Sequence, residues 1–292
     1  MALDKIRFID EVMMTLGIIG LGLMGGSLAL AVKERGLCDR VAGYNRSEES
    51  LFFALKIGMI DEALALEELI KSCDLIVAAL PVQSIVSLLP KLTAAKKSAF
   101  FTDLGSTKVA IVNAIPKEIR ERFVAAHPMA GTEYSGAKAA FSALYKERIA
   151  VLCDTEANSA EALSCVNGMF AGIGMRTVTM RSSDHDHHAA FISHLPHAIS
   201  YALANSVLSQ EDKKSILTLA AGGFRDMSRI AKSPSAVWVD IFTQNKQAIL
   251  PALEVFEREF SLAKKLVKED RWRELGEWMQ KANTLHEIFT PR

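Results

Sequence analysis

The stretch "TLGIIGLGLMGGSLALAVKERG", residues 15–36, decides the fold class of this chain. A short apolar run leads into three glycines spaced Gly-x-Gly-x-x-Gly, and a run rich in alanine and leucine follows. The first glycine suits a tight turn, the second lets a pyrophosphate approach the backbone, and the third lets the helix pack closely on the strand. Strand, turn and helix in this order predict a dinucleotide site with phosphate at the helix N-terminus. The predicted cofactor-binding residues are Gly20, Gly22, Leu23, Met24 and Gly25.

The end of the next apolar run, "RVAGYN" at 40–45, bears on which dinucleotide is bound. NAD-binding proteins carry an acidic residue about 20 residues after the glycines, where it binds the ribose hydroxyls. This chain has Asn45, Arg46 and Ser47 there. The missing carboxylate removes repulsion against a 2′-phosphate, and Arg46 can pair with one. The cofactor is therefore predicted to be NAD(P), with NADP slightly favoured and NAD still compatible, because an arginine can also stack on adenine.

Two domains are predicted from the order of the patterns. Between residues 15 and 180, short β-rich runs such as "DLIVAALP" and "RFVAAHP" alternate with helical stretches. This alternation predicts a Rossmann-like α/β domain with a mostly parallel sheet. Residues 181–292 read as helical throughout, and an all-α domain is expected there. Residues 1–14 are expected to be an N-terminal extension, with Met13 and Met14 as alternative starts.

The composition excludes several partner classes. Among the 292 residues, 34 Lys and Arg balance 34 Asp and Glu, so no net charge favours nucleic acid or an anionic membrane. No apolar run reaches the roughly 18 residues of a membrane span, and the N-terminus lacks the pattern of a signal peptide. The four cysteines are scattered without a C-x-x-C pair, which suits a reducing compartment. A cytoplasmic location is therefore predicted.

Five of the seven histidines lie in "DHDHHAAFISHLPH", residues 184–197. On a helix, the histidines at 187 and 194 are nearly aligned, and His197 lies close to the same face. A zinc site needs three or four converging ligands, "HExxH" is absent, and Pro196 distorts the helical spacing. No metal is therefore predicted. His185 and Asp186 are expected at the helix start in a structural role, and His187 and His188 are expected to face solvent.

Two polar segments follow predicted strands. "FFTDLGSTK" places Ser106 after one strand, and "FVAAHPMAGTEYSG" places His127 and Glu133 at the end of the next. In open α/β sheets the ligand lies beyond the carboxyl ends of the strands, so both segments are expected near a nicotinamide. Oxidation of a hydroxyl-bearing carbon requires removal of the O–H proton. A neutral histidine with a pKa near 6.5 suits that task, which makes His127 the candidate base.

Taken together, five motifs resemble the prephenate/arogenate dehydrogenase family of tyrosine biosynthesis. They are "GLGLMGGS", "DLGSTK", "HPMAGTE", "SHLPH" and "FRDMSRIAKSPSAVW", in that order, and they span most of residues 15–245. The resemblance implies an oxidative decarboxylation. Hydride leaves ring C4 for the nicotinamide, the C4 hydroxyl loses its proton, and the ring carboxylate leaves as CO2. The helical tail is similar to the family's dimerisation domain, which implies a homodimer.

The resemblance also implies roles for individual residues. His127 would be the base on the C4 hydroxyl, and Ser106 its partner beside the nicotinamide. Arg229 would bind a substrate carboxylate through its planar guanidinium, with Asp226 one helical turn away to orient it. The remaining residues expected to line the substrate pocket are Glu133, Ser193 and His197.

Several alternatives stay open at this point. Prephenate is favoured over arogenate because His197, as a hydrogen-bond donor, sits better beside a keto acid than beside an ammonium. Another dehydrogenase with a Rossmann domain and a helical dimer domain is a competitor. A β-hydroxyacid dehydrogenase would place a catalytic lysine where this chain has "SHLPH", and a pyrroline-carboxylate reductase is a second example. A protein that senses NAD(P) without chemistry is the alternative from a different class.

Overall fold

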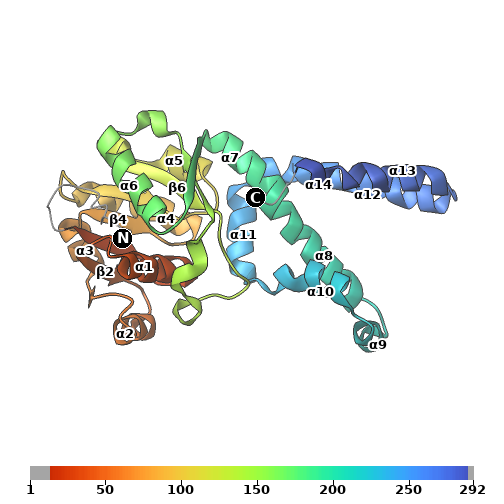
Figure 1. Ribbon diagram of the computed structural model, residues 1–292, viewed down its shortest axis with the longest axis horizontal. Coiled ribbons are helices and arrows are strands. Elements are labelled where there is room, and N and C mark those ends of the chain that lie inside the picture. The colour runs from red at the N-terminus through yellow and green to blue at the C-terminus, as the bar shows by residue number, and fades with distance from the viewer. Residues whose placement is uncertain (1–13, 289–292) are drawn as a thin grey trace, which may run out of the picture. The chain divides into compact units, whose positions relative to one another are not determined.

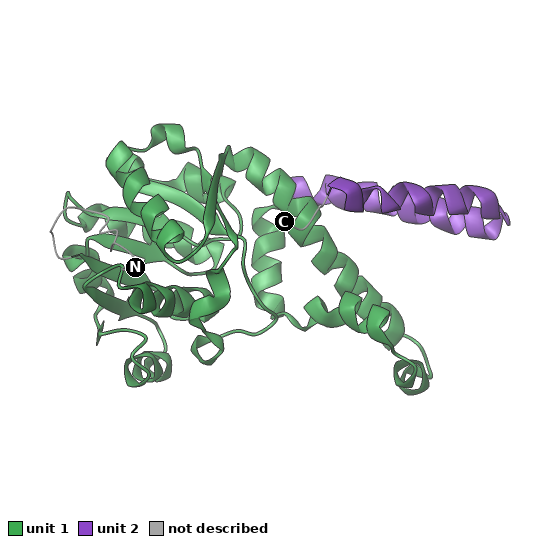
Figure 2. Ribbon diagram, viewed as in Figure 1, with its two compact units in different colours: residues 1–246 green, residues 247–292 purple. Residues whose placement is uncertain are grey.

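The computed structural model describes residues 14–288, and it divides into two compact units at Lys246 (Figure 2). The predicted N-terminal extension, apart from Met14, lies outside the described residues. The first unit contains an eight-stranded sheet (Figure 1). Its strands are β1 (Thr15–Ile19), β2 (Arg40–Tyr44), β3 (Glu62–Ala63), β4 (Leu75–Ala78), β5 (Phe100–Asp103), β6 (Phe123–Pro128), β7 (Ile149–Cys153) and β8 (Arg176–Met180).

The strand order is β3-β2-β1-β4-β5-β6-β7-β8, and among these described strands only the β6–β7 pair is antiparallel. The predicted α/β fold with a mostly parallel sheet is confirmed. The strand β3 was not predicted, because two residues carry no periodic signal. Since β1, β4, β5 and β6 are parallel, their carboxyl ends meet at one edge of the sheet. That edge carries the glycines, Ser106 and His127.

Helices cover both faces of the sheet. The helices of this α/β part are α1 (Leu23–Arg35), α2 (Glu48–Lys56), α3 (Leu66–Ser72), α4 (Val82–Leu88), α5 (Val109–Ala114) and α6 (Ala160–Gly172). Apolar residues of α1 and α6 share one buried cluster with Leu75 and Val77 of β4. Residues of α3, α4 and α5 share the other cluster with Ile76 and Ala78. Alternate residues of one strand thus face opposite layers, which is why the central strands read as continuous apolar runs.

The first unit continues as helices after Met180. These are α7 (Ser182–Ala189), α8 (Leu195–Leu208), α9 (Lys213–Thr218), α10 (Gly222–Ser228) and α11 (Ser235–Gln244). A π-helical turn, Ala190–His194, joins α7 to α8 without a break. We call the continuous stretch 182–208 the histidine helix. The all-α prediction for this region holds.

The second unit consists of α12 (Lys246–Lys268), α13 (Trp272–Asn283) and α14 (Leu285–Ile288). Trp278 of α13 donates to the Glu259 carboxylate of α12 across 2.8 Å. The large apolar side chains of Met279 in α13 and Leu285 in α14 are exposed. Over residues 14–288, no helix combines the length and apolarity needed to cross a bilayer.

Candidate active site

The glycine turn, residues 20–25, joins β1 to α1 and has three distinct reasons for its glycines. Gly20 has φ +103°, and a Cβ there would lie 2.3 Å from the carbonyl oxygen of Ala79. A Cβ on Gly25 would lie 1.9 Å from the carbonyl oxygen of Gly20. A Cβ on Gly22, in contrast, would meet no atom of the chain within 4 Å. The fold itself therefore requires Gly20 and Gly25, while Gly22 keeps open a space that the chain does not fill.

The N-terminus of α1 leaves its N–H groups free for an anion. Gly22 is the N-cap and supplies no side-chain hydrogen bond, and the first turn contains no acidic residue. The N–H groups and the positive end of the helix dipole both favour a phosphate at this position. The cradle next to Gly22 thus fits the pyrophosphate of a dinucleotide. The side chains of Leu23 and Met24 are half-buried in this turn.

The end of β2 is bound to the turn by one side chain. The Asn45 amide oxygen accepts a hydrogen bond from the Leu21 backbone N–H at 3.3 Å. Ser47 caps α2 and accepts from the Ser50 N–H at 3.2 Å. Arg46 is exposed and forms no ion pair with the described residues. Its guanidinium is therefore available to a ligand, while Asn45 and Ser47 shape the backbone around it.

A buried ion pair connects β5 and β6 directly behind the site. The side chains of Asp103 and Lys108 are 0% exposed, and the ammonium binds the carboxylate and, at 2.7 Å, the carbonyl oxygen of Ala126. Asp103 also accepts from the backbone N–H groups of Gly105 at 2.8 Å and Ala126 at 3.1 Å. These bonds fix the loop that carries Ser106 and the residue before His127. Charges buried this deeply persist only when they are paired and hydrogen-bonded.

His127 lies at the end of β6 and is joined to two residues of the histidine helix. Its Nδ1 lies 2.8 Å from His185 Nε2, and His185 Nδ1 lies 2.7 Å from Asp186 Oδ1. The Asp186 carboxylate also accepts from the backbone N–H groups of Lys108 and Val109, at 2.7 and 2.9 Å. The expected structural role of His185 and Asp186 at a helix start therefore captures only part of the arrangement. They connect α7 to the candidate base and to the loop beside it.

Burial lowers the pKa of His127 well below its ordinary value of 6.5, and the neighbouring His185, Lys108 and His194 lower it further. His127 is consequently neutral at pH 7. Its Nδ1 is engaged by His185, and its Nε2 has no hydrogen-bond partner among the described residues. A neutral imidazole accepts a proton at its bare ring nitrogen, so Nε2 is a proton acceptor when Nδ1 carries the hydrogen.

Pro196 shapes the middle of the histidine helix. Proline lacks an N–H and its ring clashes with the carbonyl four residues earlier, which accounts for the π-helical turn at Ala190–His194. His194 is buried there, and its Nδ1 lies 3.1 Å from the amide nitrogen of Asn245. The same amide donates to the Asp186 carbonyl oxygen at 2.7 Å. Asn245 thus fastens α11 to the turn, and burial lowers the pKa of His194 to about 4.

His197 is held by a ring stack and a backbone hydrogen bond. Its ring stacks on Trp238 of α11 with 3.4 Å between centroids. Its Nδ1–H donates to the carbonyl oxygen of Ser193 at 2.9 Å, so a neutral His197 presents a bare Nε2 that can only accept. Burial lowers the pKa of His197, and the nearby Arg229 lowers it too. Neutral His197 therefore has no free N–H to donate to a keto acid, contrary to the expectation that favoured prephenate.

Arg229 is paired with Glu133 across the site. The distance from Arg229 Nη1 to Glu133 Oε2 is 3.3 Å, and the Arg229 side chain is 53% exposed. The structure thus brings together two predicted substrate residues from segments 96 positions apart. Asp226, expected to orient Arg229, is exposed and forms no ion pair with it within residues 14–288. The carboxylate that contacts the guanidinium is that of Glu133.

The remaining candidates, Ser106 and Ser193, form no side-chain hydrogen bonds within the described residues. The side chains of Ser106 and Ser193 are half-buried, and neither hydroxyl has a hydrogen-bond partner among the described residues. His187 and His188 are exposed, as expected for solvent-facing residues. Within residues 14–288, no cluster of three or more histidine, cysteine or acidic side chains could hold a metal ion.

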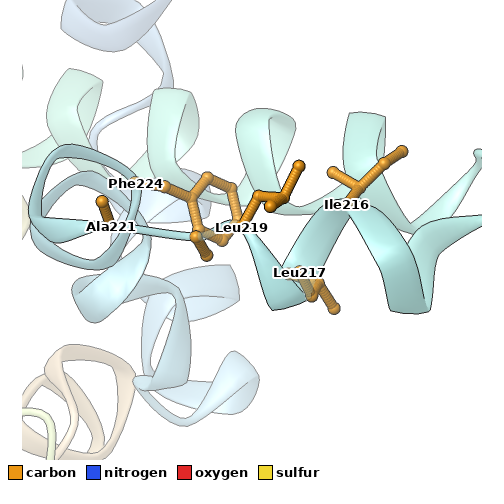
Figure 3. A pocket seen from close by; sticks show the side chains of 6 residues that line it. Ile216, Leu217, Leu219, Ala221 and Phe224 are labelled. Atoms are coloured by element: carbon orange, nitrogen blue, oxygen red, sulfur yellow. The ribbon is translucent and has the colours of Figure 1, made fainter.

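An apolar surface lies on α9 and α10 and the turn between them (Figure 3). Leu219 is 84% exposed, and Ile216 and Leu217 are also exposed. The pocket they form with Phe224 contains no charged side chain. Exposed apolar patches are typical of surfaces that contact another protein.

Comparison with known proteins decides the family. A family model described as "Prephenate dehydrogenase, nucleotide-binding domain" matches residues 28–179, and one described as "Prephenate dehydrogenase, dimerization domain" matches residues 181–281. The chain belongs to the prephenate dehydrogenase family. Membership confirms the resemblance deduced from the five motifs and the predicted class of NAD(P)-dependent oxidoreductase.

Individual relatives of this family agree over nearly the whole chain. The prephenate dehydrogenase of Bacillus subtilis is 32% identical over 262 residues, 88% of this chain and 71% of that protein. The Aquifex aeolicus prephenate dehydrogenase, solved with hydroxyphenyl propionate and NAD+, superposes with a TM-score of 0.88 at 30% identity. That match covers 96% of this chain and 99% of that one. The Synechocystis arogenate dehydrogenase has a TM-score of 0.78 at 30% identity, over 95% and 100% of the two chains.

Sequence reasoning missed three parts of the site. The Asp103–Lys108 pair was visible only as two charges at the end of an apolar strand. Asn245 fell in a helical stretch without a local signal, and Trp238, the last residue of the fifth motif, was given no role. Of these, the Asp103–Lys108 pair was the easiest to predict. An acid and a lysine five residues apart beside an apolar strand are expected to pair, because a buried charge is costly without a partner.

Proposed function

We propose that this protein oxidatively decarboxylates prephenate to 4-hydroxyphenylpyruvate, with His127 as the base. The observation that carries the proposal is the state of His127. It is neutral, its Nε2 is free, and it lies at the edge of the sheet where the glycine turn opens. A proton acceptor next to a dinucleotide cradle is what removal of a hydroxyl proton during hydride transfer requires. Ser106, with its free hydroxyl on the adjacent loop, binds the same substrate oxygen.

The glycine turn would hold NAD(P), with the pyrophosphate beside Gly22 and the adenosine ribose beside Asn45 and Arg46. When bound, the oxidised nicotinamide supplies the acceptor for the hydride that leaves ring C4. The proton of the C4 hydroxyl goes to His127 Nε2, and the bond to the ring carboxylate breaks, releasing CO2. The electron pair of that bond completes the aromatic ring. We propose NADP as the slightly preferred cofactor, because Arg46 is exposed and unpaired within the described chain.

Arg229 binds a carboxylate of the substrate. Glu133 occupies one nitrogen of the guanidinium at 3.3 Å, which orients the side chain while its exposed remainder stays available. A planar guanidinium binds carboxylate in two parallel hydrogen bonds, so the orientation set by Glu133 determines where the substrate lies. Ser193 and His197 line the same side, with the His197 ring fixed by Trp238. Asp226 contributes to the surrounding surface.

Arogenate is the second candidate substrate, and His197 gives it a specific argument. The bare Nε2 of neutral His197 accepts hydrogen bonds, and the ammonium of arogenate donates them, whereas the keto oxygen of prephenate does not. A relative of equal identity to the Aquifex enzyme is named arogenate dehydrogenase. Prephenate remains the main proposal because the Bacillus and Aquifex relatives are named for it.

The protein is further proposed to be a homodimer that buries the apolar surface of α9 and α10. The support is the dimerization-domain match over residues 181–281, which contains this surface. Changing Leu219 to Asp places a charge in the centre of the patch. We expect the variant to sediment as a monomer in analytical ultracentrifugation, and an unchanged sedimentation coefficient would assign the interface to another surface.

Steady-state kinetics with prephenate and arogenate, each with NAD and NADP, test the proposed function. We expect turnover of prephenate, with a higher kcat/KM than for arogenate and a modest advantage for NADP. A higher kcat/KM for arogenate would move the assignment to the second candidate. Cofactor binding without turnover of either substrate would favour the NAD(P) sensor and end the proposal.

A further inference from the structure

His127, His185 and Asp186 form a row of buried side chains, and the proposed function uses only the first of them. They are 9%, 2% and 3% exposed, and the two contacts in the row are 2.8 and 2.7 Å long. The rings of His127 and His185 meet edge to face at 73°. Contacts this short between buried polar atoms are hydrogen bonds whose direction can be worked out.

The proton positions follow from the carboxylate outward. The Asp186 carboxylate only accepts, and two backbone N–H groups already point at it, so His185 Nδ1 carries the proton between them. A neutral His185 with Nδ1–H has a bare Nε2. That nitrogen must accept from His127, so His127 carries its proton on Nδ1. The nitrogen left bare is His127 Nε2, the one that the proposed function needs as the base.

We propose that Asp186 and His185 are a positioning relay for His127. They hold it in the Nδ1–H tautomer, and when Nε2 takes the substrate proton, the Nδ1 proton moves to His185 Nε2. One N–H bond forms at His127 Nε2, one breaks at Nδ1, and one forms at His185. The positive charge then lies on His185 beside the Asp186 carboxylate, and the reverse movement follows when Nε2 releases its proton to water. This inference rests on the proposed function, because it takes His127 as the base.

The surrounding charges favour moving the positive charge from His127 to His185. Burial, Lys108 and His194 all disfavour a charge on His127 and lower its pKa. Lys108 is itself paired with Asp103. An anion in contact with His185 stabilises a charge there through a charge-assisted hydrogen bond. The relay thus provides a place for the charge that His127 alone lacks.

The anchoring of Asp186 makes the relay rigid. Its side chain is fixed by the N–H groups of Lys108 and Val109, and its carbonyl oxygen by the Asn245 amide. These bonds tie α7 to the start of α5 and to α11. With its carboxylate held by two N–H groups at the start of α5 and its backbone held by Asn245, Asp186 keeps the His185 ring in one orientation, as supporting hydrogen bonds must do for a catalytic histidine.

Two substitutions of His185 separate its functions in kinetic experiments. In His185→Asn the amide reaches the position of ring Nδ1 and keeps the bond to Asp186, but nothing accepts from His127. In His185→Gln the amide oxygen reaches the position of Nε2 and accepts from His127, but cannot take up its proton. We expect kcat to fall about 10²-fold in the asparagine variant and about tenfold in the glutamine variant, with KM for substrate within a few-fold. His188→Asn, on the exposed side of the same helix, is the matched control and should keep the wild-type kcat.

The pH dependence distinguishes a relay from a purely structural contact. The acid limb of the kcat profile reports the protonation of the base in the complex. Asp186→Asn removes the anion that favours the positive charge, so the limb should move to lower pH by about one unit while the plateau kcat falls. A structural role would lower kcat at every pH and leave the limb in place, which would contradict the proposal.

The tautomer can be read directly in the wild-type protein, so the test does not depend on any relay variant folding. Two-bond ¹H–¹⁵N spectra of ¹⁵N-histidine protein distinguish protonated from bare ring nitrogens, and the His127 signals are those missing in His127→Asn. We expect a protonated Nδ1 and a bare Nε2 on His127. The opposite tautomer would overturn the relay.

Failure of the relay and failure of the proposed base give different results. If His127→Asn keeps the wild-type kcat, the base assignment fails and the relay with it. If His127→Asn loses activity while His185→Asn stays within about twofold of wild type, only the relay fails. An unchanged kcat in His185→Gln alone would overturn the proton transfer to His185.

Discussion

The glycine turn and the histidine helix are both rich in one residue type, yet they build the site in opposite ways. In the glycine turn, the reasons for Gly20 and Gly25 lie nearby, in the turn itself or beside the adjacent strand, such as the 1.9 Å approach of a Gly25 Cβ to the Gly20 carbonyl oxygen. In the histidine helix, the meaning of His185 depends on a residue 58 positions earlier in the chain. A local motif thus encodes the proposed cofactor cradle, while tertiary contacts decide which histidine lies beside the candidate base.

The same difference separates the histidines from each other. His187 and His188 are exposed, while His185 and His194 are buried within the same 14-residue stretch. Helical spacing alone groups these side chains by face, but it cannot say which face meets β6. The histidines of this helix have separate partners. His185 contacts the candidate base, His194 contacts Asn245, and His197 stacks on Trp238.

The largest expected effect follows from changing His127, the candidate base that His185 of the histidine helix contacts. In His127→Asn, the amide nitrogen can still contact His185, but no base faces the substrate. We expect kcat to fall by about 10²–10⁴, which corresponds to roughly 3–5 kcal/mol of activation free energy, with KM within a few-fold. Steady-state kinetics measures this. A wild-type kcat in this variant would show that His127 is not the base. The contacts between the histidine helix and His127 would then serve packing alone.

The second effect concerns stability at low pH. The pKa of His194 is about 4 in the folded state, against about 6.5 in the unfolded chain, so the unfolded state binds the extra proton. The stabilisation is complete above about pH 6.5 and is lost as the pH falls toward 4, by on the order of 2–3 kcal/mol at pH 4.5. The lowered pKa values of His127 and His197 act in the same direction.

Urea denaturation at pH 7 and pH 4.5 measures the difference. His194→Gln should reduce the pH dependence of the unfolding free energy by that amount, whatever its effect on stability at pH 7. His188→Gln, from the exposed face, should keep the full dependence. Equal pH dependence in the wild type and His194→Gln would show that burial in the folded state does not lower the pKa of His194.

These differences explain how far the sequence alone could predict the molecule. The parallel sheet and the glycine turn follow from local periodicity and from glycine geometry, and both predictions were confirmed. The association of Glu133 with Arg229 follows from no local rule, since Asp226 was the nearer acid in sequence. The row from His127 to Asp186 depends on how α7 docks against β6 and β7, which only the folded chain decides. The domain boundary at 180/181 and the roles of the site residues remain predictions.

The third prediction separates two glycines within the glycine turn. Gly25→Ala forces a Cβ against the Gly20 carbonyl and should destabilise the protein by about 1–3 kcal/mol. Gly22→Ala adds a Cβ in open space, so the unfolding free energy should stay within about 0.5 kcal/mol of wild type. Its KM for the cofactor should nevertheless rise by at least about tenfold, or 1.4 kcal/mol, because the pyrophosphate needs that space. Thermal unfolding and cofactor titration measure the two effects, and unchanged cofactor affinity in Gly22→Ala would contradict the assignment of the cradle.

The smallest expected effect tests whether Arg46, which lies outside the glycine turn, contributes to the choice between NADP and NAD. Arg46 follows β2 and is exposed, and an acidic residue there would resemble the usual NAD arrangement. In Arg46→Glu, the new carboxylate repels a 2′-phosphate and accepts from ribose hydroxyls. The ratio of kcat/KM for NADP to that for NAD should therefore fall by about tenfold, the loss of one charge-assisted contact. Lys97→Glu makes the same change of charge shortly before β5, at the amino ends of the parallel strands and away from the glycine turn. It should leave the ratio unchanged. If both variants shift the ratio equally, the preference reflects the overall field of the protein, and Arg46 has no specific contact with the phosphate.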